Sequence, residues 1–338
     1  MSLNVAIVGL PNVGKSTLFN ALLKRQQAYV ANFPFATIEP NIGIVPVPDS
    51  RLDALAEVIS EQSIVNGAKT KPPIVPATVE FKDIAGLIEG ASRGEGLGNK
   101  FLTHIRETDA ICYVLRAFSD PDIIKQGVKD PKSDFEILKI ELQLSDEEMV
   151  VRASVKASAG KQTSTENLPL FSKKPFLVVL NVDEADLKKA GDIETEYAGK
   201  LGIDRNQIVA ICAKTESELS ELSSEDQKTY LKGLGVEKSG LERLIQKAFA
   251  TLGLITFLTA GEKEVRAWTL PAGTDAVRAS GVIHTDFEKK FIKADVVDFD
   301  DFISNNAWKN CRELGKVRSE GRDYIVKDGD VIEFRIGN

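Results

Sequence analysis

A glycine-rich motif close to the N-terminus constrains this chain more than any other feature. Residues 9–16 read Gly-Leu-Pro-Asn-Val-Gly-Lys-Ser, which fits the pattern G-x-x-x-x-G-K-[ST]. A continuously apolar run precedes the motif, and a segment with helical spacing follows it. Strand, glycine loop and helix in this order predict a phosphate-binding loop, because backbone N–H groups and a helix N-terminus attract negative charge. In such a loop we expect Gly9 and Gly14 to let the backbone wrap the phosphates, Lys15 to reach the β- and γ-phosphates and Ser16 to ligate Mg²⁺.

Two later motifs narrow this prediction to a nucleotide switch. Asp83-Ile-Ala-Gly86 fits D-x-x-G, in which the aspartate holds the Mg²⁺ shell through water and the glycine N–H senses the γ-phosphate. Between the two motifs lies the loop 32–41, whose Thr37 is placed to close on Mg²⁺ and the γ-phosphate. The order of these three motifs indicates loops that ATP or GTP closes and hydrolysis releases.

A fourth motif is expected to contact the base. Asn181-Val-Asp-Glu184 ends an apolar run, where guanine-reading proteins carry Asn-Lys-x-Asp. Val182 replaces the lysine that stacks under the base, and Glu184 is one methylene longer than aspartate. Misplacing an oriented group by about 1 Å costs about 100-fold. Guanine preference should therefore be weakened or lost, which favours adenine as an alternative base. Cys212-Ala213-Lys214 is the expected base-supporting loop.

The composition fits a globular protein with about two domains at roughly 150 residues each. The 338 residues are 43% hydrophobic and 28% charged, with a net charge of −7 that argues against indiscriminate nucleic-acid binding. No apolar run approaches the about 18 residues of a membrane span, and no signal peptide is visible. The three cysteines are far apart and odd in number, which favours a reducing cytosol.

Strand-like and helical segments alternate through most of the chain. This predicts an α/β fold: a P-loop NTPase G domain over residues 1–253, with a mixed, mostly parallel sheet. A short helical insertion is expected at about 130–172, with a helix over 134–150 and a Ser/Thr/Lys-rich loop over 153–167. Residues 254–338 change character and predict a separate small α+β domain.

The run 83–102 resembles the Obg group of switch GTPases. Together with Thr37-Ile-Glu-Pro-Asn41 and Asn181-Val-Asp-Glu184, it is similar to Obg-like ATPases of the YchF type. Segments 267–270, 283–288 and 323–330 resemble that family's TGS domain, a β-grasp module. The resemblance implies a cytosolic ATPase that also accepts GTP, uses Mg²⁺, associates with ribosomes and acts in translation or stress responses.

The resemblance also implies particular site residues. Nucleotide contacts map onto Asn12, Val13, Gly14, Lys15, Ser16 and Thr17, with Ser16 and Thr37 as magnesium ligands and Asn181–Val182 against the adenine. The implied partner is the ribosome, its large subunit or the whole particle, contacted by a monomer through the TGS and G domains. Two departures matter: the family's long helical hairpin is shortened here, and Cys112-Tyr113 stand where some members carry a histidine.

The group that orients the attacking water is not identified by the sequence. Leu87 occupies the position of the glutamine used by many switch GTPases, so unassisted hydrolysis should be slow, about 10⁻⁴ to 10⁻² s⁻¹. The expected catalytic residues are Lys15, Thr37 and Gly86. The missing group could come from Arg93, Glu95 or His104, from Lys15 and Mg²⁺ alone, or from a partner.

Several alternatives stay open at this point. The chain could be a guanine-specific Obg-type GTPase, or a binding module whose nucleotide is structural and not hydrolysed. Asn12 could cap its loop or help bind a monovalent cation. Lys289, Lys290 and Lys293 could form a patch on one helix face that contacts RNA phosphates, or a solvated face with no ligand.

Overall fold

The computed structural model describes residues 3–32, 41–62, 64–65, 68–84, 97–119, 130–158 and 168–337. The chain forms two compact units. The first comprises Met1–Val45 and Val79–Leu252, and the second comprises Pro46–Thr78 and Gly253–Asn338. No helix of the described residues is long and apolar enough to cross a bilayer.

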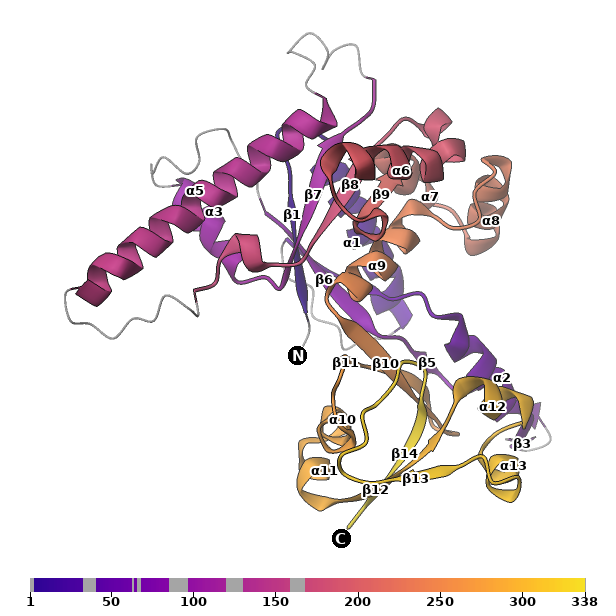
Figure 1. Ribbon diagram of the computed structural model, residues 1–338. Coiled ribbons are helices and arrows are strands. Elements are labelled where there is room, and N and C mark those ends of the chain that lie inside the picture. Colours follow the sequence, from indigo (N-terminus) through magenta and orange to yellow (C-terminus); the bar gives the residue numbers. More distant parts are fainter. Residues whose placement is uncertain are drawn as a thin grey trace. The chain divides into compact units, whose positions relative to one another are not determined.

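A six-stranded sheet in the order β2-β6-β1-β7-β8-β9 is the centre of the first unit (Figure 1). β1 pairs in parallel with β6 and β7, and β8 pairs in parallel with β7 and β9. β1, β7, β8 and β9 are nearly continuous apolar runs, as expected for parallel strands buried on both faces, whereas buried and partly exposed residues alternate along β6. Their bounds are β1 (Asn4–Val8), β2 (Ile42–Pro46), β6 (Thr78–Asp83), β7 (Ala110–Arg116), β8 (Phe176–Asn181) and β9 (Ile208–Ile211).

Helices cover both faces of this sheet. One face packs against α3 (Leu97–Arg106), α5 (Pro131–Ser158) and α6 (Ala190–Leu201) around a core that contains Ile111, Leu138 and Leu180. Alternate strand residues point to the other face, where α9 (Gly240–Thr251) packs against β8 and β9. The described residues of this unit also form α1 (Lys15–Asn32), α7 (Ala213–Leu219), α8 (Ser224–Gly233) and the short 3₁₀ turns η2 (Phe171–Lys173), η3 (Glu184–Lys189) and η4 (Arg205–Gln207). The predicted α/β P-loop fold is therefore confirmed.

The insertion differs from its prediction in one respect. The helix α5 continues to Ser158, so residues 153–158 are helical and not part of a loop. Ala153, Lys156 and Ala157 are good helix formers. The helix therefore continues beyond the segment in which apolar residues recur at helical spacing. The C-terminal part of α5 extends away from the sheet in Figure 1. Residues 159–167 lie outside the described part of the chain.

The second unit is built on another six-stranded sheet, in the order β13-β12-β14-β10-β11-β5. Antiparallel pairs join β10 to β11 and β12 to both β13 and β14. Phe257, Ala279 and Val296 are fully buried in its core. The strands of this sheet and the helices after residue 253 are β5 (Ile74–Val75), β10 (Leu254–Ala260), β11 (Val265–Pro271), β12 (Phe291–Val297), β13 (Arg318–Glu320), β14 (Val331–Ile336), α10 (Ala276–Ile283), α11 (Thr285–Lys290), α12 (Phe299–Ser304) and α13 (Trp308–Glu313).

The division into 1–253 and 254–338 that the sequence suggested differs from these units. Residues 46–78 carry α2 (Ser50–Gln62), β3 (Ile64–Val65), β4 (Ala68–Lys69) and β5, and they pack with the C-terminal sheet. β5 adds to this sheet as an edge strand through the pair Val265↔Ile74. The Arg51 guanidinium bonds Asp328 and the Thr256 hydroxyl, each at 2.8 Å. Long-range pairing of this kind leaves no local signal in the sequence.

Candidate nucleotide site

The loop between β1 and α1 has the backbone geometry that its glycines predict. Gly14 has a φ of +85°, and Asn12 has a φ of 62°, a region that glycine and asparagine tolerate best. A β-carbon at Gly9 would lie 2.7 Å from the Val114 carbonyl oxygen of the neighbouring strand β7. The loop therefore approaches both its own helix and the sheet too closely for larger residues.

Lys15 and Asp83 face each other across this loop. The Lys15 ammonium donates to the carbonyls of Gly9 at 3.2 Å and Leu10 at 3.5 Å. Burial lowers the pKa of Lys15 and raises the pKa of Asp83, and each charge partly opposes the shift of the other. A partly desolvated lysine is suited to bind a polyanion, and the neighbouring carboxylate is suited to bind the cation that accompanies it.

Asp83 also provides a test of the implied Mg²⁺. Its Oδ1 is buried and has no hydrogen-bond partner among the described residues. Ser16 and Thr17 are exposed in the first turn of α1, as a magnesium-ligating hydroxyl requires. An unsatisfied carboxylate oxygen and a hydroxyl are hard oxygen ligands of the kind Mg²⁺ prefers. The residues present therefore fit this ion, whereas no cluster of three or more His, Cys, Asp or Glu side chains that could hold a metal occurs in the described parts of the chain.

Asn181 connects the phosphate loop to the base side of the site. Its Nδ2 donates to the Val13 carbonyl at 2.9 Å, and its Oδ1 accepts the Ala213 N–H at 3.0 Å. The side chain lies at the end of β8 and is buried. One amide therefore fixes the phosphate loop against the Cys212-Ala213-Lys214 loop, in which Cys212 and Ala213 are buried and Lys214 is exposed.

The other two base-motif residues behave differently from each other. The Val182 side chain is 2% exposed and belongs to the hydrophobic core, so only its backbone is placed to meet a base. Glu184 is exposed, and its carboxylate accepts the Thr215 hydroxyl at 3.2 Å and the Tyr230 hydroxyl at 3.5 Å. Sequence reasoning missed Thr215 and Tyr230: Thr215 directly follows the base-supporting loop, but nothing local to Tyr230 marks it.

Several expected site residues are not placed by the structure. Thr37, Gly86, Leu87, Arg93 and Glu95 lie outside the described residues. His104 is exposed on α3 and makes no hydrogen bond or ion pair with any described residue.

The expected lysine patch is wrong in one member. Lys293 lies in β12 and not on the helix of Lys289 and Lys290, because α11 ends before Phe291, which packs in the core. Its ammonium pairs with Asp295 at 2.9 Å. Lys289 and Lys290 remain exposed at the end of α11.

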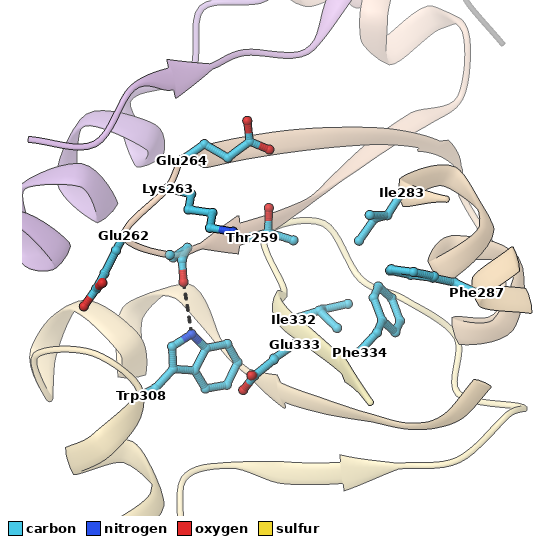
Figure 2. A pocket seen from close by; sticks show the side chains of 12 residues that line it. Thr259, Glu262, Lys263, Glu264, Ile283, Phe287, Trp308, Ile332, Glu333 and Phe334 are labelled. Atoms are coloured by element: carbon cyan, nitrogen blue, oxygen red, sulfur yellow. Dashed lines mark hydrogen bonds between the residues drawn. The ribbon is translucent and has the colours of Figure 1, made fainter. Parts of the chain in front are cut away.

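A hollow of about 480 Å³ lies in the second unit (Figure 2). Its apolar part is formed by Ile283, Phe287, Ile332 and Phe334, and Trp308 donates its indole N–H to the Ala260 carbonyl beside it. Glu262, Lys263 and Glu264 lie at its edge. None of the motifs singled out from the sequence contributes a catalytic group to this hollow, so the candidate site is that of the first unit.

Comparison with known proteins agrees with this placement. Residues 4–154 match a family model described as "50S ribosome-binding GTPase", and residues 254–337 match the model YchF-GTPase_C, described as "Protein of unknown function (DUF933)". The chain is 43% identical to "Ribosome-binding ATPase YchF" of Bacillus subtilis, with 99% of each chain covered. The chain belongs to the YchF family. The YchF protein of Haemophilus influenzae is also 43% identical, again over 99% of each chain.

A solved YchF structure extends the match to three dimensions. The Schizosaccharomyces pombe YchF GTPase has a TM-score of 0.83 and 32% identity, and the match covers 99% of this chain and 98% of the fungal one. The alignment with the Bacillus subtilis YchF protein spans 377 residues, 39 more than the 338 of this chain. The alignment therefore contains gaps in this chain. The relatives are named ATPases and GTPases, that is, nucleoside-triphosphate hydrolases.

Proposed function

We propose that this protein is a Mg²⁺-dependent nucleoside triphosphatase that binds and slowly hydrolyses ATP, with GTP as a second substrate. The main support for this proposal is the pair of hydrogen bonds made by Asn181, which joins the phosphate loop and the base loop into one site. The names of the relatives support the same activity.

The residues of the chain have separate tasks in this proposal. Backbone N–H groups of the Asn12–Thr17 loop and the N-terminus of α1 bind the triphosphate, and Lys15 neutralises charge that develops when water attacks the γ-phosphorus and the β–γ bond breaks. Ser16, Thr37 and, through water, Asp83 would hold Mg²⁺, which supplies electrostatic stabilisation of the phosphate oxygens when bound. Gly86 would sense the γ-phosphate.

The base specificity follows from Glu184. Its carboxylate is engaged by Thr215 and Tyr230, and no lysine lies at the position of Val182 to stack under a base. A site with these replacements loses the two-point recognition that guanine receives from an aspartate. ATP is therefore the favoured substrate, and Val182 contributes through its backbone, because its side chain is buried.

The proposed output is nucleotide-controlled binding to the ribosome. Relatives carry the name "Ribosome-binding ATPase YchF", and the N-terminal family model is described as ribosome-binding. We extend this to a cytoplasmic, monomeric switch that contacts the large subunit or whole particle through both units and acts in translation or stress responses. Lys289 and Lys290 are candidates for an RNA contact.

The test is a pair of dissociation constants for ATP and GTP with Mg²⁺, followed by single-turnover hydrolysis with and without ribosomes. Tighter ATP binding and turnover that ribosomes accelerate are expected. A strong GTP preference would instead indicate a guanine-specific enzyme. Tight binding with no turnover in either condition would indicate a binding module whose nucleotide is structural.

Cosedimentation with ribosomes tests the proposed switch function separately from the proposed hydrolase activity. With purified ribosomes, the fraction of protein bound should differ between a non-hydrolysable ATP analogue and ADP. Equal binding in both nucleotide states would contradict the switch and leave the hydrolase in place.

A further inference from the structure

Two hydroxyl groups hold the side chain of Glu184. Thr215, at the start of α7, donates to Oε2 at 3.2 Å. The Tyr230 hydroxyl, on α8, lies 3.5 Å from both Oε1 and Oε2. These residues are 31 and 46 positions from Glu184, so tertiary structure alone brings them to the base motif.

Both hydroxyls are fixed as donors. Thr215 is 1% exposed, so packing encloses its side chain, and its hydroxyl donates to the Glu184 carboxylate. Burial and the nearby Glu184 carboxylate raise the pKa of Tyr230, which keeps the phenol protonated. Among the described residues Glu184 has no ion pair with a lysine or arginine. Among the described residues, the two hydroxyls are therefore the side-chain groups within hydrogen-bonding reach of this carboxylate.

The base edges respond differently to a carboxylate in this position. Guanine presents two adjacent N–H donors, on N1 and N2, and a carboxylate satisfies both only if its two oxygens are free to face them. Adenine presents one amino group beside a ring nitrogen acceptor and has no use for two acceptor oxygens. Hydrogen bonds that hold the Glu184 carboxylate away from the base therefore weaken the binding of guanine more than the binding of adenine.

We propose that Thr215 and Tyr230 are specificity-determining positioning residues, which hold the Glu184 carboxylate against α7 and α8 and so lower the affinity for GTP relative to ATP. This inference rests on the proposed nucleotide site. It names two residues outside the motif as the cause of its base preference.

The experiment measures the dissociation constants of Mg-ATP and Mg-GTP for the full chain and for Thr215→Val, Tyr230→Phe and the double variant. Each substitution removes a hydroxyl with little change in shape. The ratio Kd(GTP)/Kd(ATP) should fall about three- to tenfold in the double variant, the range expected for a net hydrogen bond or two. Because both nucleotides share the triphosphate, the ratio is insensitive to damage at the phosphate loop.

Matched controls isolate the hydroxyls. Thr215→Ser retains the donor and should restore the wild-type ratio. Tyr197→Phe removes a hydroxyl on α6 that makes no hydrogen bond with a described residue, and it should leave the ratio unchanged. Tyr230→Phe in a Glu184→Ala background should also change nothing, because the positioned carboxylate is gone.

Three outcomes would overturn the inference. An unchanged ratio in a folded double variant contradicts it, and so does an equal effect of Tyr230→Phe with and without Glu184. If Thr215→Val fails to fold, the half-buried Tyr230 still decides the question through its own variant. Failure of the wild-type chain to bind either nucleotide would refute the proposed function itself and this inference with it.

Discussion

Gly14 and Asn181 approach each other so closely that a β-carbon on Gly14 would lie 2.2 Å from the Asn181 amide nitrogen. That nitrogen is the donor to the Val13 carbonyl. The phosphate loop and the base motif, 167 positions apart in sequence, thus meet at van der Waals distance. The phosphate loop and the base motif therefore pack against each other directly. Small changes at this contact should affect the binding of both the phosphates and the base.

Gly14→Ala should abolish tight nucleotide binding. The new methyl group would displace Asn181, and alanine is strained at a φ of +85°. We expect the dissociation constant for Mg-ATP to rise about 100-fold, the scale of a 1 Å misplacement. Titration calorimetry checks this, with Gly199→Ala as control, because a β-carbon at Gly199 would meet nothing within 4 Å beyond its chain neighbours and its own helix backbone. Wild-type affinity in Gly14→Ala would contradict the close approach.

Asn181→Asp tests the role of the Asn181 amide with a nearly isosteric substitution. The substitution keeps an acceptor for the Ala213 N–H but places an oxygen against the Val13 carbonyl oxygen, so two acceptors face each other in a buried position. Chemical denaturation should show a loss of about 1–3 kcal/mol, the cost of an unsatisfied buried group. Asn206→Asp, at an exposed position, should be neutral. A neutral Asn181→Asp would mean that the amide does not join the two loops.

The part of this site that sequence predicts is the part encoded locally. Gly9–Ser16 combines a buried strand, a glycine loop and a helix start within a few residues, so its conformation follows from its own sequence. Asn181 was located because it ends an apolar strand. Tyr230 was not, because its role depends on how α8 packs near Glu184. Residues 46–78 were misplaced for the same reason: strand pairing with β11 is a long-range contact.

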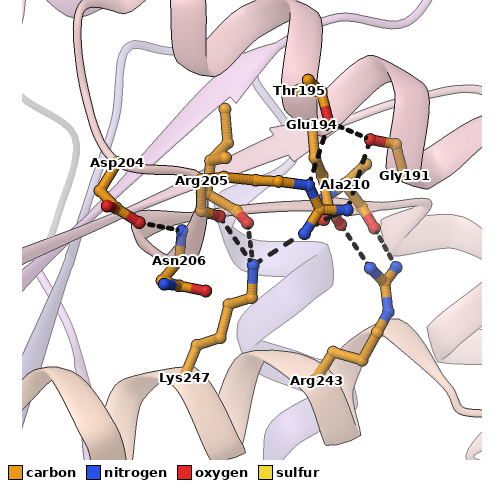
Figure 3. Close-up of polar contacts among 10 residues, drawn as sticks. Gly191, Glu194, Thr195, Asp204, Arg205, Asn206, Ala210, Arg243 and Lys247 are labelled. Carbon is orange, nitrogen blue, oxygen red and sulfur yellow. Dashed lines mark hydrogen bonds and ion pairs between the residues drawn. The ribbon is translucent and has the colours of Figure 1, made fainter.

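The open edge of the first sheet is another feature that sequence could not indicate. β9 is one of the two edge strands, β2 being the other, and its outward groups bond side chains instead of another strand (Figure 3). Glu194 accepts the Ala210 N–H at 3.1 Å, Arg243 donates to the Ala210 carbonyl, and Lys247 donates to the Ile208 carbonyl. Occupying an edge in this way removes a template for aggregation.

Glu194→Gln should destabilise the protein by about 3 kcal/mol. The carboxylate is 3% exposed and is surrounded by Arg205, Arg243 and Lys247, which would lose their only buried countercharge in the described part of this cluster (Figure 3). Thermal unfolding measures the effect. Glu196→Gln removes an exposed pair with Lys200 on the same helix and should cost less than about 1 kcal/mol. Equal losses in the two variants would contradict a structural role for the cluster.

The second unit should lose stability in acid through Asp328. Burial alone would raise the pKa of this carboxyl, but the Thr256 N–H and the Arg51 guanidinium outweigh it, and the pKa is lowered. A lowered folded pKa means that the folded state holds the proton less tightly than the unfolded state. The stabilisation is therefore present above the ordinary aspartate range and is lost as the pH falls through and below it.

Asp328→Asn should make the free energy of unfolding depend less on pH in the acid range. Its free energy of unfolding should be lower than that of the wild type at pH 7. The difference should shrink as the pH falls from about 5 through the ordinary aspartate range and below it, because the carboxyl is protonated first in the unfolded and then in the folded wild type. Urea titrations at several pH values, followed by the fluorescence of Trp268 and Trp308 in the second unit, measure both curves. Asp300→Asn, at an exposed position on α12, should reproduce the wild-type pH profile. A constant offset between Asp328→Asn and wild type at every pH would show that the carboxylate acts through packing and not through its charge.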